Sequence, residues 1–241
     1  MQKNTKKKLF VVAVAVCLIA ILSFSTLAWF SDSHSVENEF HMAGDADTPE
    51  EIFSIGVWEP VDEDGNGIID EDEKKDGEEY YDILPGGKYP KQPHVENTGS
   101  YDAYIRMSVT VTNADAWIAA LNNKLGGANG YDLANLFLGH DETKWTRYEE
   151  GKYDANANTY TMTFYYNDIL IPGAEAYLFT HVQIPGELTQ NDMVYLGGTF
   201  NINVKADAVQ TLNLGDGVDT AYEAFAVVEA TQDLNQIPDP T

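Results

Sequence analysis

One twelve-residue stretch, DEDGNGIIDEDE at residues 62–73, has the residue types and spacing of a calcium-binding loop. Calcium takes oxygen ligands, and an EF-hand loop supplies them from side chains at positions 1, 3, 5, 9 and 12 and a carbonyl at position 7. Gly67 falls at position 6, where the chain turns sharply and a side chain would clash. The predicted ligands are the side chains of Asp62, Asp64, Asn66, Asp70 and Glu73 and the carbonyl of Ile68.

The segment before the loop, IFSIGVWEPV at residues 52–61, does not favour the entering helix of an EF-hand. It is rich in β-branched and aromatic residues, and Pro60 stands two positions before the loop. We therefore expect an EF-hand-like calcium loop inserted in a β protein, with a weak extracellular affinity of about 10⁻⁴ to 10⁻³ M. The alternative is a flexible acidic linker, because Asp, Asn and Gly are also common in ordinary turns.

The N-terminus has the three parts of a secretory signal peptide. A basic start, MQKNTKKK, is followed by an apolar run at residues 9–24 and by small residues at Thr26 and Ala28. The pattern predicts a signal peptide at residues 1–28, cut by a signal peptidase between Ala28 and Trp29. An uncleaved membrane anchor is the alternative, because the apolar run approaches the length of a bilayer span. With cleavage, we expect a secreted protein with no lasting membrane insertion.

Composition limits the partners and the chemistry of the chain. The formal net charge is −25, which argues against nucleic acid and anionic membranes as partners. The single cysteine, Cys17, lies in the predicted signal peptide, so the mature chain would hold no disulfide, thiolate zinc site or cysteine nucleophile. An acid-rich segment at residues 45–82 surrounds the calcium loop, and bound calcium would supply its missing positive charge.

The rest of the chain has the sequence pattern of a β protein. Residues 101–112 alternate apolar and polar residues with period two, which predicts a half-buried strand. Further strands are expected at residues 144–151, 159–167, 174–184 and 198–210. Short helices are expected at residues 113–127 and 219–230 and a second helical turn within 131–139, before a polar tail at 231–241. The pattern predicts one mainly β domain at residues 29–241, a jelly-roll-like antiparallel β-sandwich with short helical insertions.

No constellation of catalytic residues stands out. Zinc hydrolysis needs about three N or O ligands and a general base, and no HExxH motif is present. HDETK at residues 140–144 and His181 are the interior histidines with acids nearby. A lone strand histidine is more often a packed or surface residue than a ligand. The Gly-x-Ser-x-Gly motif of serine hydrolases is also absent, so we predict no catalytic residues.

Three stretches together resemble the TasA/camelysin family of secreted proteins. The first is the export signal followed by TLAWFSDSHSVENEFHMAG at residues 26–44, with matching residues Ala28, Trp29, Phe30, Ser31, Asp32, Asn38, Phe40, Ala43 and Gly44. The second, at residues 84–109, resembles the family's Pro-Gly turn, a strand ending in Asn-Thr-Gly and an Ala-Tyr-Ile-Arg strand. The third is VKADAVQ at residues 204–210 with the Ala-rich helix behind it.

This resemblance implies a jelly-roll-like fold and export from a Gram-positive cell by a SipW-type signal peptidase. It also implies one of two roles, a TasA-like fibre subunit of the biofilm matrix or a camelysin-like, casein-cleaving surface metallopeptidase. The acidic calcium loop is a departure from the family pattern.

The fibre role has a physical mechanism in the new N-terminus left after cleavage. This segment is short and partly β-prone, with Trp29, Phe30, Val36 and Phe40 as candidate anchors. Such a strand could add to the exposed sheet edge of another copy and build an open filament. The alternative is that the segment folds back as an edge strand of its own domain. A further alternative is a non-polymerising extracellular binding module that stacks sugars on aromatic side chains.

Overall fold

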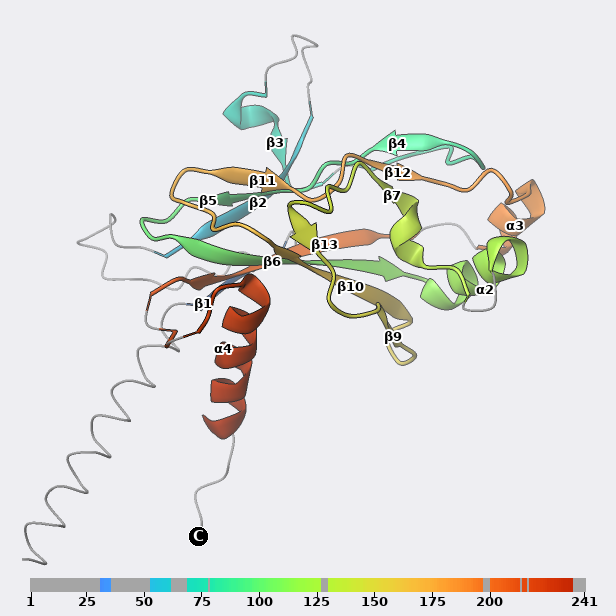
Figure 1. Cartoon of the computed structure of the whole chain (residues 1–241). Coiled ribbons are helices and arrows are strands. Elements are labelled where there is room, and N and C mark those ends of the chain that lie inside the picture. The colour runs from blue at the N-terminus through green and yellow to red at the C-terminus, as the bar shows by residue number, and fades with distance from the viewer. Residues whose placement is uncertain are drawn as a thin grey trace, which may run out of the picture.

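The computed structural model describes most of the chain beyond its N-terminal segment (Figure 1). The described residues are 53–61, 69–77, 79–126, 130–196, 200–212, 214–215 and 217–235, together with the backbone of 31–35. Within them the protein is mainly β, with antiparallel sheets and few helices, as the sequence predicts. The predicted signal peptide and cleavage site lie outside the described residues.

The largest sheet has six strands and is antiparallel throughout. Its order is β1 (Ser31–Ser35), β13 (Ile202–Gln210), β6 (Ala103–Thr112), β10 (Thr159–Tyr166) and β8 (Trp145–Thr146), with β9 (Lys152–Asp154) also pairing with β10. The alternation predicted for β6 is present, because Ile105, Met107, Val109 and Val111 are all fully buried.

Two smaller sheets lie over one face of this large sheet (Figure 1). One has the order β11 (Glu175–Tyr177), β5 (His94–Asn97), β2 (Ile55–Pro60) and β3 (Lys74–Lys75). The other has the order β4 (Lys88–Pro90), β12 (His181–Gln183) and β7 (Phe137–Leu138). The main hydrophobic core lies between the layers, where Val57 and Val95 of one layer join Met107 and Val109 of the other.

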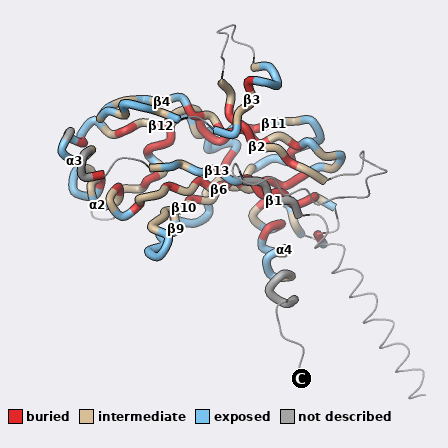
Figure 2. The backbone as a smooth tube through the Cα atoms, turned by 180° about the vertical axis from the view of Figure 1, so that it is seen from behind, coloured by how far each residue is buried: buried red, intermediate tan, exposed pale blue. Residues whose placement is uncertain are grey.

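The helices close the ends and the outer face of these layers. The helix α2 (Ala114–Leu125) buries Trp117 and Leu121 beside α3 (Gln190–Tyr195), at one end of the molecule (Figure 2). The helix α4 (Ala221–Asn235) packs on the outer face of the large sheet, where Ala224 and Phe225 contact Tyr104 and Val209 in a second apolar cluster. Within the described residues, none of the helices combines the length and apolar character needed to cross a membrane.

Two sequence-based strand boundaries are wrong, and the helical turn expected within residues 131–139 is present. The strand expected at residues 174–184 is two short strands in different sheets, because Leu178 and Phe179 are both buried and interrupt the alternation. The strand expected at 144–151 is only the two residues of β8, and residues 131–139 form the 3₁₀ helix η3 (Leu133–Leu136) followed by β7.

The helix expected at residues 219–230 extends further than the sequence predicts. The helix α4 runs to Asn235, and the Thr231 hydroxyl donates a hydrogen bond to the carbonyl of Val227 one turn back, at 2.8 Å. The Thr231 hydroxyl therefore bonds within the helix that contains it, as threonine often does inside helices.

Candidate functional site

The predicted calcium loop connects two paired strands. β2 pairs with β3 through Glu59 opposite Lys75 and Pro60 opposite Lys74. The amide of Val61 donates a hydrogen bond to the carbonyl of Glu73 at 3.0 Å, directly across the two ends of the loop. β2 and β3 therefore form an antiparallel pair that the loop connects, and the described residues before the loop form a strand, as the sequence predicts, in place of the entering helix of an EF-hand.

Two predicted ligands, Asp70 and Glu73, lie within the described residues at the exit of the loop. Asp70 caps the 3₁₀ helix η2 (Glu71–Glu73) and Glu73 is its last residue, and the Asp70 amide donates a hydrogen bond to the Glu73 carboxylate at 3.1 Å. Glu73 is only 5% exposed, so its carboxylate is held in place at the base of the hairpin. The other four predicted ligands, Asp62, Asp64, Asn66 and Ile68, lie outside the described residues.

The all-oxygen ligand set is chemically suited to calcium. If calcium binds, Asp70 and Glu73 would hold it from the exit side, and the ion would neutralise part of the acidic segment. Within the described residues, no group of three or more His, Cys, Asp or Glu side chains is placed to hold a metal ion.

Lys74 on β3 ties the exit of the loop to β5 of the same sheet. Its ammonium lies 3.0 Å from the carboxylate of Glu96 on β5 and 3.0 Å from that of Glu71 in η2. Hydrogen bonds to these two carboxylates raise the pKa of Lys74 above its ordinary value. The same ammonium lies 4.8 Å from the ring centroid of Trp58, a cation–π distance. A change of conformation in the loop would thus reach Trp58 through one side chain.

Next to Lys74, three aromatic side chains form a row across three strands. His94 on β5 stands opposite Trp58 on β2 and Tyr177 on β11. Its ring centroid is 4.0 Å from that of Trp58 and 5.8 Å from that of Tyr177. Burial, with a smaller effect of the Lys74 charge, lowers the pKa of His94 to about 4. His94 is therefore neutral at pH 7, and neither of its ring nitrogens has a hydrogen-bond partner within the described part of the chain.

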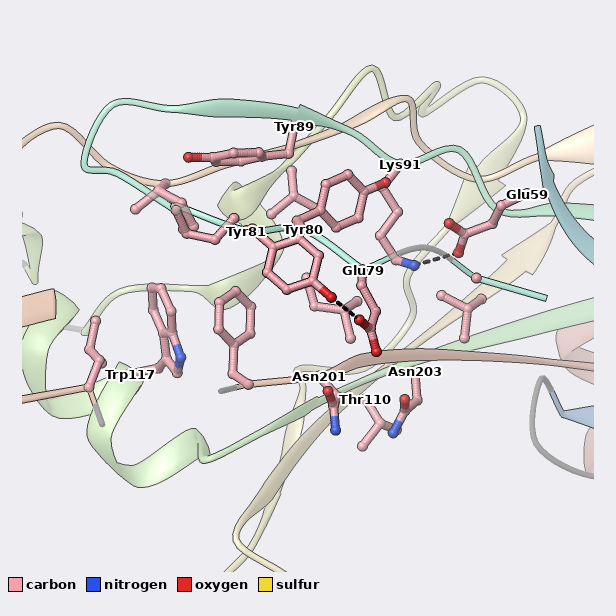
Figure 3. Close-up of a pocket in the computed structure, with 18 of the residues that line it drawn as sticks. Glu59, Glu79, Tyr80, Tyr81, Tyr89, Lys91, Thr110, Trp117, Asn201 and Asn203 are labelled. Atoms are coloured by element: carbon pink, nitrogen blue, oxygen red, sulfur yellow. Dashed lines mark hydrogen bonds and ion pairs between the residues drawn. The ribbon is translucent and has the colours of Figure 1, made fainter. Parts of the chain in front are cut away.

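A cavity of about 910 Å³ lies between the layers beside β13 (Figure 3). Trp117 lies at one end and the buried ion pair of Lys91 and Glu59 at the other, with Tyr80 and Tyr89 along one wall. The opposite wall is the start of β13 and the residues just before it, including Asn201 and Asn203. The Trp117 indole N–H is buried and has no hydrogen-bond partner among the described residues.

The N-terminal strand β1 forms the edge of the large sheet next to β13. β1 pairs antiparallel with β13 of its own chain, from Ser31 opposite Val209 to Ser35 opposite Lys205. In this single chain β1 thus occupies the position that the fold-back alternative describes. The four predicted anchors, Trp29, Phe30, Val36 and Phe40, lie outside the described residues.

The interior histidines do not gather into a hydrolytic site. The His140 ring nitrogen contacts the Leu178 carbonyl at 3.3 Å, and His181 contacts the Thr180 hydroxyl at 2.9 Å. Asp141, next to His140, accepts hydrogen bonds from the amide and hydroxyl of Thr143, and these bonds lower its pKa. HDETK is therefore a turn in which the acidic side chain organises the backbone.

The Asn-Thr-Gly stretch stabilises a turn through the side chain of Asn97. Asn97 is fully buried, and its amide donates to the carbonyls of Tyr101 and Leu170, both at 2.8 Å. Its side-chain oxygen accepts from the amide of Gly99 at 3.1 Å. Asn97 thereby anchors the turn between β5 and β6.

The residues that sequence reasoning missed are Trp58, His94 and Trp117. Each is an ordinary aromatic residue in the sequence, and it becomes notable only where strand pairing or helix packing buries an unpartnered nitrogen.

No family model, curated protein or solved structure matches the chain.

Proposed function

We propose that this chain is a secreted structural protein of the surface or biofilm matrix of a Gram-positive bacterium. In this proposal the mature chain is a TasA-like fibre subunit with a jelly-roll-like β-sandwich fold. Its partners are other copies of itself, which it joins by strand addition, or other matrix proteins, and calcium stabilises each subunit.

The place of β1 at the edge of the large sheet, on a long connection to β2, is the observation that best supports this proposal. β1 adds five residues, SDSHS, to one edge of the sheet, and all five pair with β13 in register. Residues 36–54 connect β1 to β2, and at about 3.3 Å per residue they can span roughly 60 Å. A connection of that length allows β1 to reach the equivalent edge of a neighbouring copy.

Such an exchange would be heterologous, because the donor segment and the acceptor edge are different surfaces. A head-to-tail contact of this kind grows into an open filament unless its rotation closes a ring. The exchanged strand keeps the backbone hydrogen bonds it makes within one chain, so swapping costs little in enthalpy.

The calcium loop supports the extracellular part of the proposal. Residues 29–241 contain no cysteine, so a secreted form must be stabilised without disulfides. Calcium at the tip of the β2–β3 hairpin would close an acidic loop and neutralise carboxylates that otherwise repel one another.

The test is assembly of the purified mature chain, starting at Trp29, with millimolar calcium. Electron microscopy and light scattering should show filaments, and deletion of residues 29–40 should abolish them. Monomers in both preparations, with or without calcium, would refute the fibre role. A zinc-dependent digestion of casein that persists after rigorous purification would favour the peptidase alternative instead.

A further inference from the structure

The cavity between the layers has the size of a small-molecule site. Its volume is about 910 Å³, which lies toward the upper end of the range for ligand pockets in proteins. Its walls come from distant parts of the chain, namely α2, α3, β12, the start of β13 and the segment before β4 (Figure 3). A molecule held there would contact several elements at once.

The buried part of the lining is mainly apolar. Its members belong to the main hydrophobic core, and those that are themselves buried are Val182, Ile184, Leu196 and Val204. Phe200 and Ile202 are partly buried and pack against the same core. An apolar molecule would therefore bury its surface favourably against this wall.

Trp117 is held rigidly at one end of the cavity. The Asn113 side-chain amide, just before α2, donates a hydrogen bond to the carbonyl of Leu196 at 2.6 Å, which fixes the start of α2 beside α3. The ring of Phe200 packs against Trp117 with a centroid distance of 4.6 Å and an interplanar angle of 62°. Trp117 is only 1% exposed, and its nitrogen is on the side of the ring that faces the labelled side chains in Figure 3.

The Trp117 indole N–H differs from the other polar groups of the wall, because it lacks a partner. The Tyr89 hydroxyl accepts a hydrogen bond from the Leu84 amide at 2.7 Å, and the Tyr80 hydroxyl donates to a backbone carbonyl. Among the described side chains that line the cavity, the Trp117 nitrogen is the buried polar atom without a hydrogen bond. A buried donor without an acceptor is costly, so a ligand oxygen at this place would gain more than one in water.

The charges of the lining disfavour an anionic ligand. Lys91 is paired with Glu59, and Lys205 lies 2.8 Å from Asp207, so both ammonium groups of the lining already have a carboxylate partner. Three further carboxylates of the lining are exposed, and they belong to Asp76, Glu79 and Asp82. An anion that approached the cavity would meet like charge.

We propose that this cavity binds an uncharged, mainly apolar small molecule that carries a carbonyl oxygen, which accepts a hydrogen bond from the Trp117 indole N–H. The apolar body of the ligand lies against Ile184, Leu196 and Ile202, and the exposed carboxylates exclude anions. The site lies within one subunit, so it goes beyond the proposed function and does not depend on assembly.

Three fluorescent probes test the site in the wild-type mature chain, starting at Trp29. Prodan is uncharged and has a ketone, phenylnaphthylamine is uncharged and has no carbonyl, and anilinonaphthalene sulfonate is the sulfonated form of phenylnaphthylamine. Both uncharged probes should bind with increased emission, and the sulfonate should bind at least about tenfold more weakly than phenylnaphthylamine. No binding of the uncharged probes, or equal binding of the sulfonate, would overturn the proposal.

A substitution that fills the cavity locates the bound probes. Ile202→Trp adds volume inside the lining and should weaken binding of both uncharged probes at least about tenfold. The matched control is Ile171→Trp, because Ile171 is exposed and lies outside the cavity lining, and it should change binding less than about twofold. Equal effects of the two substitutions would place the probes elsewhere and remove the site.

Trp117→Phe tests the hydrogen bond, because it keeps an aromatic ring and removes the N–H. It should weaken Prodan binding at least about fivefold and phenylnaphthylamine binding less than about twofold. An equal loss for the two probes would contradict a hydrogen bond to the ligand.

Nuclear magnetic resonance of the wild-type chain tests the same bond without a substitution. The indole N–H proton of Trp117 should shift to higher frequency when Prodan binds, and much less when phenylnaphthylamine binds. A Trp117 signal that does not respond to bound Prodan would overturn the proposal.

Discussion

The rings of Trp58 and His94 stack across two neighbouring strands, with centroids 4.0 Å apart and planes inclined by 21°. His94 is 9% exposed, and Lys74 on β3 adds a positive charge nearby. Both effects disfavour the imidazolium, although the carboxylate of Glu96 opposes them, and the pKa of His94 falls to about 4. The stack thus contains a histidine that is stable only in its neutral form.

The stability of the protein should therefore fall when His94 is protonated. Between pH 6.5 and pH 4 the unfolded chain binds a proton at this site and the folded chain does not, so the free energy of unfolding decreases as pH falls. The loss from pH 7 to pH 4 should be on the order of 2 to 3 kcal/mol.

His94→Phe keeps an aromatic ring and removes the titration. The free energy of unfolding of both proteins should be measured in urea at pH 7, 5.5 and 4. The value for the variant, relative to that of the wild type, should rise as pH falls. The difference between the two proteins removes the contribution of the carboxylates that titrate in both. Parallel profiles of unfolding free energy against pH would therefore contradict the lowered pKa of His94.

Calcium binding should depend on Glu73 more than on its equally charged neighbour Asp72. Glu73 is at position 12 of the loop and can supply two oxygens, whereas Asp72 is exposed at position 11, which supplies no ligand. Glu73→Gln should weaken calcium binding at least about tenfold in calorimetry. Its amide oxygen can still accept the hydrogen bond from the Asp70 backbone.

Asp72→Asn is the matched control, because it also removes one negative charge. It should weaken binding only about twofold, through the loss of general electrostatic attraction. If the two variants bind equally, the loop attracts calcium by charge alone. If the wild type gives no heat with calcium, the motif is a linker.

Local patterns explain which parts of this molecule could be predicted. The strand β6 follows from alternation within ten residues, and α2 follows from an Asn start and a Gly stop around an apolar stripe. The calcium loop rests on an equally local pattern, because all its predicted ligands lie within twelve residues, and it stays a prediction.

Features that depend on distant strands could not be predicted in this way. The row of Trp58, His94 and Tyr177 exists only because β2, β5 and β11 pair in one register. The division of residues 174–184 into two strands likewise depends on the core that receives Leu178 and Phe179. Neither outcome is determined by the residues beside it in sequence.

The helix α4 should depend on Phe225 for its attachment to the large sheet. Phe225 is buried against Tyr104 and Val209, and the guanidinium of Arg106 lies 4.2 Å from its ring centroid. Phe225→Ala should lower the free energy of unfolding by about 3 to 5 kcal/mol in urea denaturation.

A substitution on the same helix provides the comparison. Glu229 pairs with Arg106 from an exposed position, so Glu229→Ala should cost less than about 1 kcal/mol. If the order of the two losses is reversed, the helix is attached mainly by charge.

Removing one partner of the Lys91–Glu59 ion pair should lower the free energy of unfolding much more than replacing both partners by apolar residues. Both side chains are less than a tenth exposed at the end of the cavity. Lys91→Met leaves the Glu59 carboxylate buried without its partner and should cost about 3 to 5 kcal/mol. The double variant Lys91→Met/Glu59→Leu removes both charges, and most of that stability should return. Equal losses in the single and double variants would instead mean that the stems of these side chains, and not their charges, support this end of the cavity.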